Sequence, residues 1–109
     1  MRIGNLGDLR VFLATVELGS LSKAARVLHL SLSAVSVRLK HLEEDLGCRL
    51  VVRTAKGLEL TDAGRVLARE AAEVEKRLDQ LLQAMAPFAS EEAATLRNSK
   101  EIKFTQTLT

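Results

Sequence analysis

Apolar residues recur at helical spacing through the first third of the chain. One amphipathic helix is predicted between Asp8, its expected cap, and Gly19, its expected end. Its apolar residues follow the spacing i, i+3, i+4, i+7: Leu9, Phe12, Leu13 and Val16. A second, short helix is expected after a cap at Ser20 or Ser22. It carries two adjacent small residues that would let another helix cross closely, Ala24 and Ala25.

The segment Ser31–Gly47 predicts a third helix with two different faces. Ser31 is expected to cap it and Gly47 to end it. Its apolar stripe consists of Val35, Leu39, Leu42 and Leu46. The other side of its first turns carries small polar and cationic residues: Ser31, Ser33, Ser36, Arg38 and Lys40. The acidic residues near its end, 43–45, are expected to point to solvent.

After Gly47 the hydrophobic period becomes that of strands. Two short β-prone runs, Leu50–Val52 and Leu58–Leu60, are separated by a segment ending in Gly57, which suits a turn. The pattern predicts a hairpin, which must lie against the helices because a lone two-stranded hairpin is marginal in water.

A long helix is predicted after a cap at Thr61, and it ends at about Met85 because Pro87 cannot continue it. Spacings of four and three residues alternate along one face, which comprises Leu67, Ala71, Val74, Leu78, Leu81 and Met85. Such a heptad seam packs against another helix along its length, so we expect a homodimer through this helix. An amphipathic helix that packs on its own core is the alternative.

Composition and charge narrow the class of protein. The chain has 109 residues, 47% of them hydrophobic, with three Phe and no Trp or Tyr, so we expect a mainly α-helical domain with an aliphatic core. Residues 20–57 hold seven Lys and Arg against three acidic residues, a net charge of +4, whereas residues 58–86 hold four against six. A basic segment beside an acidic one indicates a surface for a polyanion.

Other classes of function have little support. Cys48 is the only cysteine, which excludes an intrachain disulfide and a multi-cysteine metal site, and we expect it to be a small buried residue. No run approaches the roughly 18 apolar residues of a membrane span, and no signal-peptide pattern follows Met1, so we expect a cytoplasmic protein without a membrane partner. No nucleophile–base pair, metal cluster or phosphate-binding glycine loop indicates an enzyme, and no cofactor or metal is expected.

Three helices followed by a hairpin form the order of a winged helix-turn-helix. The link between the second and third helices has the spacing of that motif, with Ala25 at the crossing, His29 in the turn and Val35 buried. Because His is enriched in left-handed backbone, we interpret His29 as a turn residue and not as a ligand. The third helix would then present its polar first turns to the DNA major groove. Arg53 and Lys56 at the hairpin tip could reach a phosphate or the minor groove.

These residues resemble the N-terminal domain of the LysR-type transcriptional regulators over roughly residues 5–86. The shared motifs are "AA", "LHLS", "SAVS", "LEEDLG", "LVVRT" and "LTDAG". The resemblance implies a winged helix-turn-helix joined to a linker helix that pairs antiparallel with its twin, so that two recognition helices meet an interrupted dyad site. It also implies that Leu32, Ser33 and Val37 replace the usual Gln, Pro and often Arg of the family. Because family members use that Gln and Arg to read bases, only the docking mode is expected to carry over.

We therefore expect a winged helix-turn-helix in residues 1–60, a linker helix in 61–87, and a tail in 88–109 that is flexible or foreign to the natural protein. The family's C-terminal effector domain is absent, so we expect an artificially shortened or naturally short form without a small-molecule effector. The expected partners are double-stranded DNA and a second copy of the chain. The predicted DNA contacts are Ser22, Ser31, Leu32, Ser33, Ser36, Val37, Arg38, Lys40, Arg53, Thr54 and Lys56.

A dimeric winged-helix adaptor that binds protein and has lost DNA binding is the alternative function. The apolar Leu32 and Val37 on the recognition helix favour it. The cationic residues around them favour DNA: Arg38, Lys40, Arg53 and Lys56.

Overall fold

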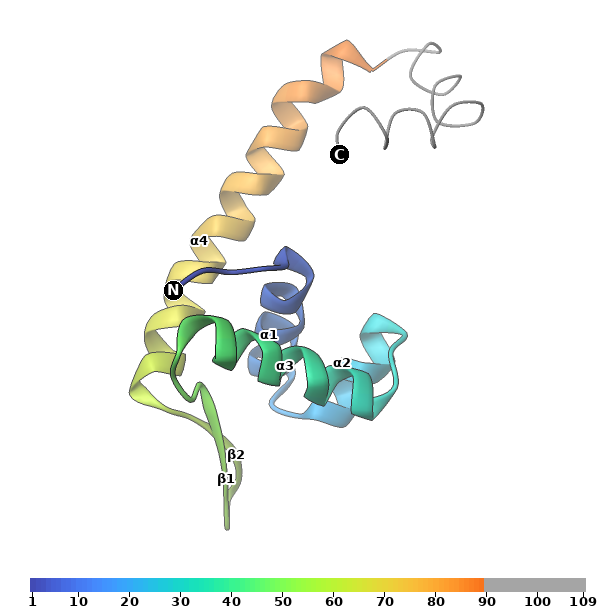
Figure 1. Ribbon diagram of the computed structural model, residues 1–109. Helices are drawn as coiled ribbons and strands as arrows, with labels where there is room; N and C mark the ends of the chain where they lie inside the picture. Colours follow the sequence, from blue (N-terminus) through green and yellow to red (C-terminus); the bar gives the residue numbers. More distant parts are fainter. Residues whose placement is uncertain (90–109) are drawn as a thin grey trace. The chain divides into compact units, whose positions relative to one another are not determined.

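Three helices, a hairpin and a long helix follow one another in the predicted order (Figure 1). A computed structural model describes residues 1–89, and the tail predicted from residue 88 onward lies almost wholly outside them. The elements are α1 (Leu6–Leu18), α2 (Leu21–Leu28), α3 (Leu32–Leu46), β1 (Val51–Thr54), β2 (Gly57–Leu60), α4 (Asp62–Met85) and the 3-10 turn η1 (Ala86–Phe88). The prediction of a mainly α-helical winged helix-turn-helix is confirmed.

The start of α1 corrects the predicted cap. Asn5, not Asp8, caps the helix, and its side chain accepts a hydrogen bond from the Gly7 N–H at 2.7 Å. Asp8 lies inside α1 and is buried. The apolar spacing did not indicate the earlier start because Leu6 is 57% exposed and lies outside the buried stripe.

The remaining helix ends follow local chemistry. Ser20, and not Ser22, caps α2 by accepting from the Lys23 N–H, and Ser31 accepts from the Ala34 N–H at 3.1 Å. Left-handed backbone ends α2 at His29 (φ 57°), as predicted, where the residue's N–H donates to the carbonyls of Ala25 and Arg26. Gly19 and Gly47 end α1 and α3 in the same conformation.

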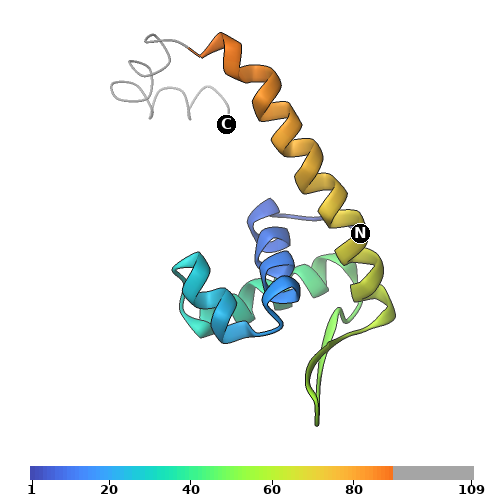
Figure 2. The ribbon, with the colours of Figure 1, turned by 180° about the vertical axis from the view of Figure 1, so that it is seen from behind.

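The core lies where α1, α2 and α3 cross. α3 passes in front of α1 in Figure 1 and behind it in Figure 2. Ala24 and Ala25 of α2 are buried, as a close helix crossing requires. The largest fully buried side chains are Phe12, Leu42, Leu50, Val35 and Thr15.

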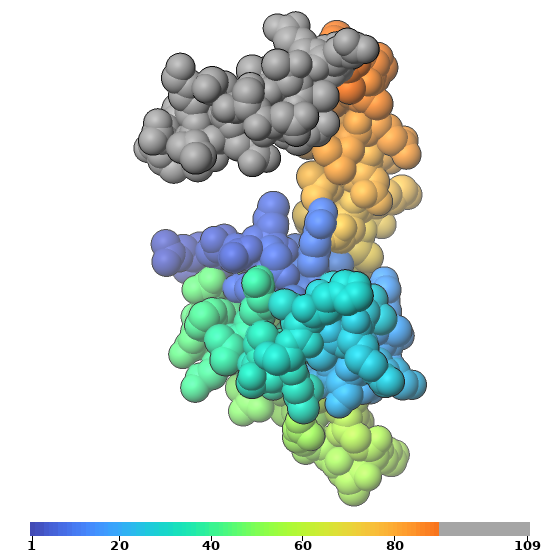
Figure 3. Space-filling model, turned by 90° about the vertical axis from the view of Figure 1, so that its right-hand side faces the viewer, coloured from blue at the N-terminus to red at the C-terminus, as the bar shows by residue number. Residues whose placement is uncertain are grey.

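The hairpin is anchored at its base and protrudes beyond the three helices at its tip (Figure 3). The strands pair antiparallel, with Val51 opposite Leu60 and Thr54 opposite Gly57. Leu50 was predicted as the first strand residue, but β1 begins one residue later, at Val51. The Leu50 side chain is part of the hydrophobic core. The Leu50 carbonyl lies so close to Gly64 of α4 that a Cβ there would come within 2.1 Å of it.

The first part of α4 belongs to the same compact unit as the winged helix, which extends from Met1 to Glu75, and a second unit begins at Lys76. Ala71 is buried in the core of its own protomer, and Leu67 packs partly against that core. The seam prediction is therefore wrong for Ala71, where the alternative of intrachain packing holds. The functional boundary at residue 60 stays a prediction.

Candidate nucleic-acid interface

One side of α3 is left exposed by the packing of the other. We define the reading face as the exposed residues of its first turns: Leu32, Ser33, Ser36, Val37 and Lys40. Val35 and Leu39, which alternate with them, are buried. Leu32 and Val37 are 48% and 51% exposed, so neither is a core residue. All five are among the predicted DNA contacts.

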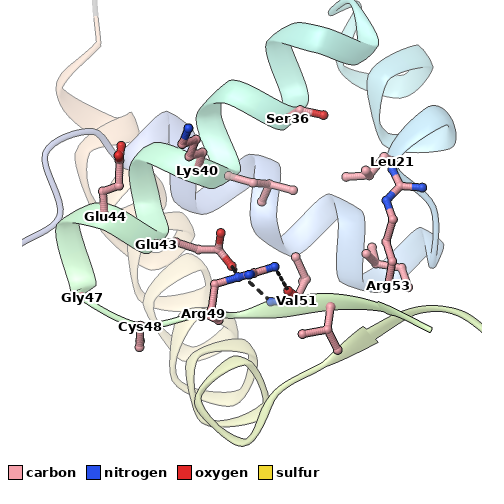
Figure 4. Close-up of a pocket in the computed structure, with 13 residues that line it drawn as sticks. Leu21, Ser36, Lys40, Glu43, Glu44, Gly47, Cys48, Arg49, Val51 and Arg53 are labelled. Carbon is pink, nitrogen blue, oxygen red and sulfur yellow. Dashed lines mark hydrogen bonds and ion pairs between the residues drawn. The ribbon is translucent and has the colours of Figure 1, made fainter.

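A groove of about 820 Å³ lies between α3 and the hairpin (Figure 4). Ser36 and Lys40 line it from α3, and Arg53 lines it from β1. A smaller hollow of about 310 Å³ brings the exposed Ser22 of α2 together with Leu32 and Arg53. Residues predicted on three separate elements therefore share one side of the winged-helix unit.

Glu43 fixes the hairpin to α3, a role that the sequence reading missed. Its carboxylate accepts hydrogen bonds from the N–H groups of Leu50, at 2.7 Å, and Val51, at 3.4 Å. The same carboxylate oxygen lies 3.5 Å from Nε of Arg49 (Figure 4). This contact sets the position of β1 relative to the reading face.

The prediction that the acidic run points to solvent holds only for Glu44, which is exposed. Asp45 instead holds the N-terminal segment, because its carboxylate accepts from the Gly4 N–H at 3.0 Å and its carbonyl from the Arg2 N–H at 3.3 Å. With Glu43 bound to the hairpin, the run serves mainly to attach neighbouring segments to the end of α3.

Arg38 forms an ion pair within the protein. Its guanidinium lies 3.5 Å from the carboxylate of Asp8, whose side chain is only 7% exposed. This ion pair joins α3 to the first turn of α1, and it accounts for the buried carboxylate that the cap prediction had placed at a helix end. Arg38 is thus half-buried and paired within the chain, and its role as a DNA contact stays a prediction.

Three of the hydroxyl groups predicted to contact DNA also have partners within the chain. Besides its capping bond, the Ser31 hydroxyl lies 3.2 Å from that of Ser33. The Thr54 hydroxyl donates to Glu59 and accepts from the Lys56 N–H at 3.1 Å, which shapes the hairpin turn. All three side chains remain exposed beside these intrachain bonds, and their role as DNA contacts stays a prediction.

The exposed cations have no such partners. Within residues 1–89, Lys40, Arg53 and Lys56 form no ion pair, although all three are exposed. Arg53 of β1 lines the two hollows beside the reading face, and Lys56 lies in the turn between β1 and β2. The side of the unit that carries Leu32 and Ser36 therefore also carries two cations without an ion pair, Lys40 and Arg53.

The predictions about the cysteine, metal sites and membrane spans can be compared with the structure over the residues that it describes. Cys48, which follows the left-handed Gly47 and lines the groove, is exposed and not buried as expected. Over residues 1–89 no cluster of His, Cys, Asp or Glu could hold a metal ion. None of the helices in that span is long and apolar enough to cross a membrane.

The predicted dimer residues differ in exposure. Val74, Leu81 and Met85 are 48%, 53% and 54% exposed, and Leu78 is half-buried. Leu82, which was not predicted, adds a further exposed side chain at 58%. Leu67 and Ala71 are the two seam positions that intrachain packing uses.

Known proteins of similar sequence are transcriptional regulators. The model of the bacterial regulatory helix-turn-helix proteins of the lysR family matches residues 6–65. The regulator YofA of Bacillus subtilis is 46% identical over 74 residues, which are 68% of this chain and 26% of that protein. The nitrogen assimilation regulatory protein nac of Escherichia coli is 37% identical over 76 residues, which are 70% of this chain and 25% of that protein. The chain thus spans about a quarter of the length of these relatives.

Solved structures of similar fold include protein–DNA complexes. The BenM DBD bound to catB site 1 DNA has a TM-score of 0.74 and 31% identity, and the match covers 79% of this chain and 97% of that one. The CbnR DBD–DNA complex has a TM-score of 0.71 and 29% identity, with coverages of 79% and 99%. The fold, the sequence matches and the exposed cationic side of the recognition helix agree. The chain belongs to the LysR family and comprises its helix-turn-helix DNA-binding domain.

Proposed function

We propose that this chain binds a dyad DNA site in a sequence-specific manner as a homodimer, with one reading face in the major groove of each half-site. The observation that supports this proposal most directly is that Arg53 of the hairpin lies beside Leu32, Ser36 and Lys40 of the reading face and forms no ion pair within residues 1–89. Hydroxyl groups and a lysine on a slim helix face suit base edges and phosphates. Structures of two relatives with this fold contain DNA, which supports the same docking here.

The hairpin would supply contacts that do not depend on sequence. Arg53 and Lys56 are exposed at positions where a duplex seated on α3 would bring its backbone close to β1. Because each neutralised phosphate releases counterions, every such contact adds about −0.9 to the slope of log K against log salt. The hairpin therefore sets affinity, and α3 sets the choice of sequence.

The homodimer rests on the exposed apolar residues of α4. Val74, Leu81 and Met85 each expose about half of their side chains, and Leu82 exposes more. Large apolar groups that recur along one helix are stabilised when a second helix covers them. A second copy is the simplest partner, since two-fold pairing of identical helices covers the same residues on both chains. Two-fold symmetry then requires two half-sites related by a dyad.

Selection of bound sites from random duplex DNA, followed by light scattering of the complex, tests the proposal. We expect a gapped inverted repeat, with centres one helical turn or a multiple apart, that binds two protomers. Replacing Arg53 with Ala should lower affinity for all duplexes alike and flatten the salt slope by about one unit. A single asymmetric half-site with one bound protomer would contradict the dyad, and failure to retain any duplex would contradict DNA binding.

One measurement would distinguish the alternative, a protein-binding adaptor, from a DNA-binding protein. An adaptor that has lost DNA binding would show no salt-dependent retention of genomic fragments. We favour DNA because Arg53 lies beside the apolar Leu32, and because Lys40, Arg53 and Lys56 form no ion pair within residues 1–89.

A further inference from the structure

Two exposed apolar side chains interrupt the polar reading face of α3. Val37 follows the fully buried Val35 by two residues, which is about 200° around an α-helix, so it points almost directly away from the core. Leu32 lies in the first turn, and the two side chains are 51% and 48% exposed. Neither belongs to the hydrophobic core or is packed against it. Their apolar surface therefore has no intrachain explanation.

The two side chains occupy opposite edges of the reading face. Five residues separate Leu32 from Val37, which places them about 140° apart on the helix. Leu32 lines the hollow that it shares with Ser22 and Arg53, whereas Val37 lines a different hollow of about 610 Å³ beside Ser33. The reading face thus has an apolar side chain at each edge and hydroxyl groups between them.

The cations on the hairpin side of this face favour a polyanion as its occupant. Lys40, Arg53 and Lys56 make no ion pair within residues 1–89, which suits a polyanion better than an apolar protein surface. In the major groove of DNA the distinctive apolar group is the C5-methyl of thymine, whereas the groups that otherwise tell the bases apart are hydrogen-bond donors and acceptors. A valine or leucine that enters the groove can therefore contribute to base choice through that methyl.

We propose that Val37 and Leu32 recognise pyrimidine C5-methyl groups, so that site selection by this chain depends on the methyl itself at two positions of each half-site. The inference rests on the proposed docking of α3 in the major groove. It extends to 5-methylcytosine, because that base carries the same methyl at the same carbon as thymine. The chain would thus distinguish methylated from unmethylated cytosine at the positions that face these two side chains.

Replacement of thymine by deoxyuridine tests the inference, because it removes the methyl and leaves every hydrogen-bonding group in place. The full chain is first used to select sites from random duplexes, and each thymine of a selected site is then replaced singly. We expect about fourfold weaker binding at one thymine for each side chain, which is the usual effect of burying one methyl-sized group. Val37→Ala should abolish the dependence at one of the two positions, and Leu32→Ala at the other.

Val66→Ala provides a matched control, because Val66 is a helical valine with 50% exposure on α4, away from the reading face. This variant should keep the thymine-to-deoxyuridine ratio of the wild type at both positions. In a second series, cytosine placed at a sensitive position should weaken binding, and 5-methylcytosine at the same position should recover about fourfold.

The outcomes separate this inference from the proposed function. Equal affinity for thymine and deoxyuridine at every position of a tightly bound site would overturn methyl recognition and leave DNA docking intact. A methyl dependence that survives in both Val37→Ala and Leu32→Ala would assign it to other residues and would also overturn the inference. If no duplex is retained in the selection, the proposed function fails first.

Discussion

The role of His29 is determined by its backbone conformation and not by contacts of its side chain. Its φ of 57° lies in the left-handed region, which costs about 1–2 kcal/mol for an L-residue with a Cβ. Its side chain is exposed, and its N–H completes the end of α2. The residue therefore contributes a conformation and not a packing contact.

Replacing His29 with Gly should stabilise the protein by about 0.5–1 kcal/mol, because Gly adopts the left-handed conformation without the Cβ penalty. Urea unfolding monitored by circular dichroism would show a higher midpoint with an unchanged m-value. His29→Ala is the control and should be no more stable than the wild type. A lower midpoint for the Gly variant would mean that the imidazole makes a stabilising contact.

Leu32 offers a second test at the scale of one side chain. Since it is 48% exposed, Leu32→Gln should leave the melting temperature almost unchanged. An amide can pair in bidentate fashion with adenine, which is worth roughly 1–3 kcal/mol of discrimination, so the selected site should change from thymine toward adenine at one position of each half-site. A lower melting temperature with an unchanged selected site would show that Leu32 packs inward and does not touch DNA.

At the scale of elements, the hairpin depends on groups outside its own sequence. The Glu43 carboxylate satisfies two backbone N–H groups at the start of β1, and Gly64 lets α4 approach the Leu50 carbonyl. A two-stranded hairpin has too few contacts of its own to remain in place. Its position is therefore encoded in α3 and α4.

Neighbouring glutamates provide a test of this attachment. Glu43→Ala should destabilise the protein by about 1–3 kcal/mol, because it leaves the partly buried N–H of Leu50 without a partner. Glu44→Ala, at an exposed position, should change stability by no more than about 0.5 kcal/mol. Hydrogen exchange should show faster exchange at Leu50 and Val51 in the Glu43 variant alone. Equal exchange in both variants would contradict the role of Glu43.

Gly64 provides the second test of element packing. Because a Cβ would come within 2.1 Å of the Leu50 carbonyl oxygen, Gly64→Ala requires backbone movement and should cost about 1–3 kcal/mol, despite the better helix propensity of Ala. Val66→Ala, two residues later at an exposed position, is the control and should have little effect on thermal unfolding. A Gly64→Ala variant as stable as the wild type would show that the helix and hairpin can separate freely.

The sequence predicted those features that depend on nearby residues. The caps at Ser31 and Thr61, the helix ends at Gly47 and His29, and the buried stripe of α3 follow from spacing and backbone preference. Contacts between distant residues were missed, as for Asp8 with Arg38, because an acidic residue near a helix start has the same local pattern whether it caps or is buried. Ala71 was misplaced for a related reason, since an apolar heptad position is the same for a partner helix and for its own core.

At the scale of the whole molecule, the sequence predicts a homodimer, whereas the structure describes a single protomer. The exposed apolar residues of α4 connect the two scales, because a homodimer would cover them and place two reading faces on one duplex. Leu81 is the clearest probe, since it is 53% exposed in the protomer and its substitution should not disturb the core.

Leu81→Lys should therefore abolish the homodimer without unfolding the protomer, because two-fold pairing would bring charges together in an apolar interface. Light scattering at tens of micromolar should give the dimer mass for the wild type and the protomer mass for the variant. Gln80→Lys, on an adjacent position of the same helix, controls for added charge. A monomeric wild type would contradict pairing through α4.

The bond between Glu43 and β1 has a consequence for the DNA itself. Since the hairpin is fixed to α3, the protein would set the distance between the groove that α3 is proposed to enter and the phosphates that the hairpin is proposed to reach. A duplex whose groove width does not match must bend or twist to make both contacts, and the cost of that deformation depends on the stiffness of its base steps. We therefore expect base pairs that no side chain touches, between α3 and the hairpin, to influence affinity through their flexibility.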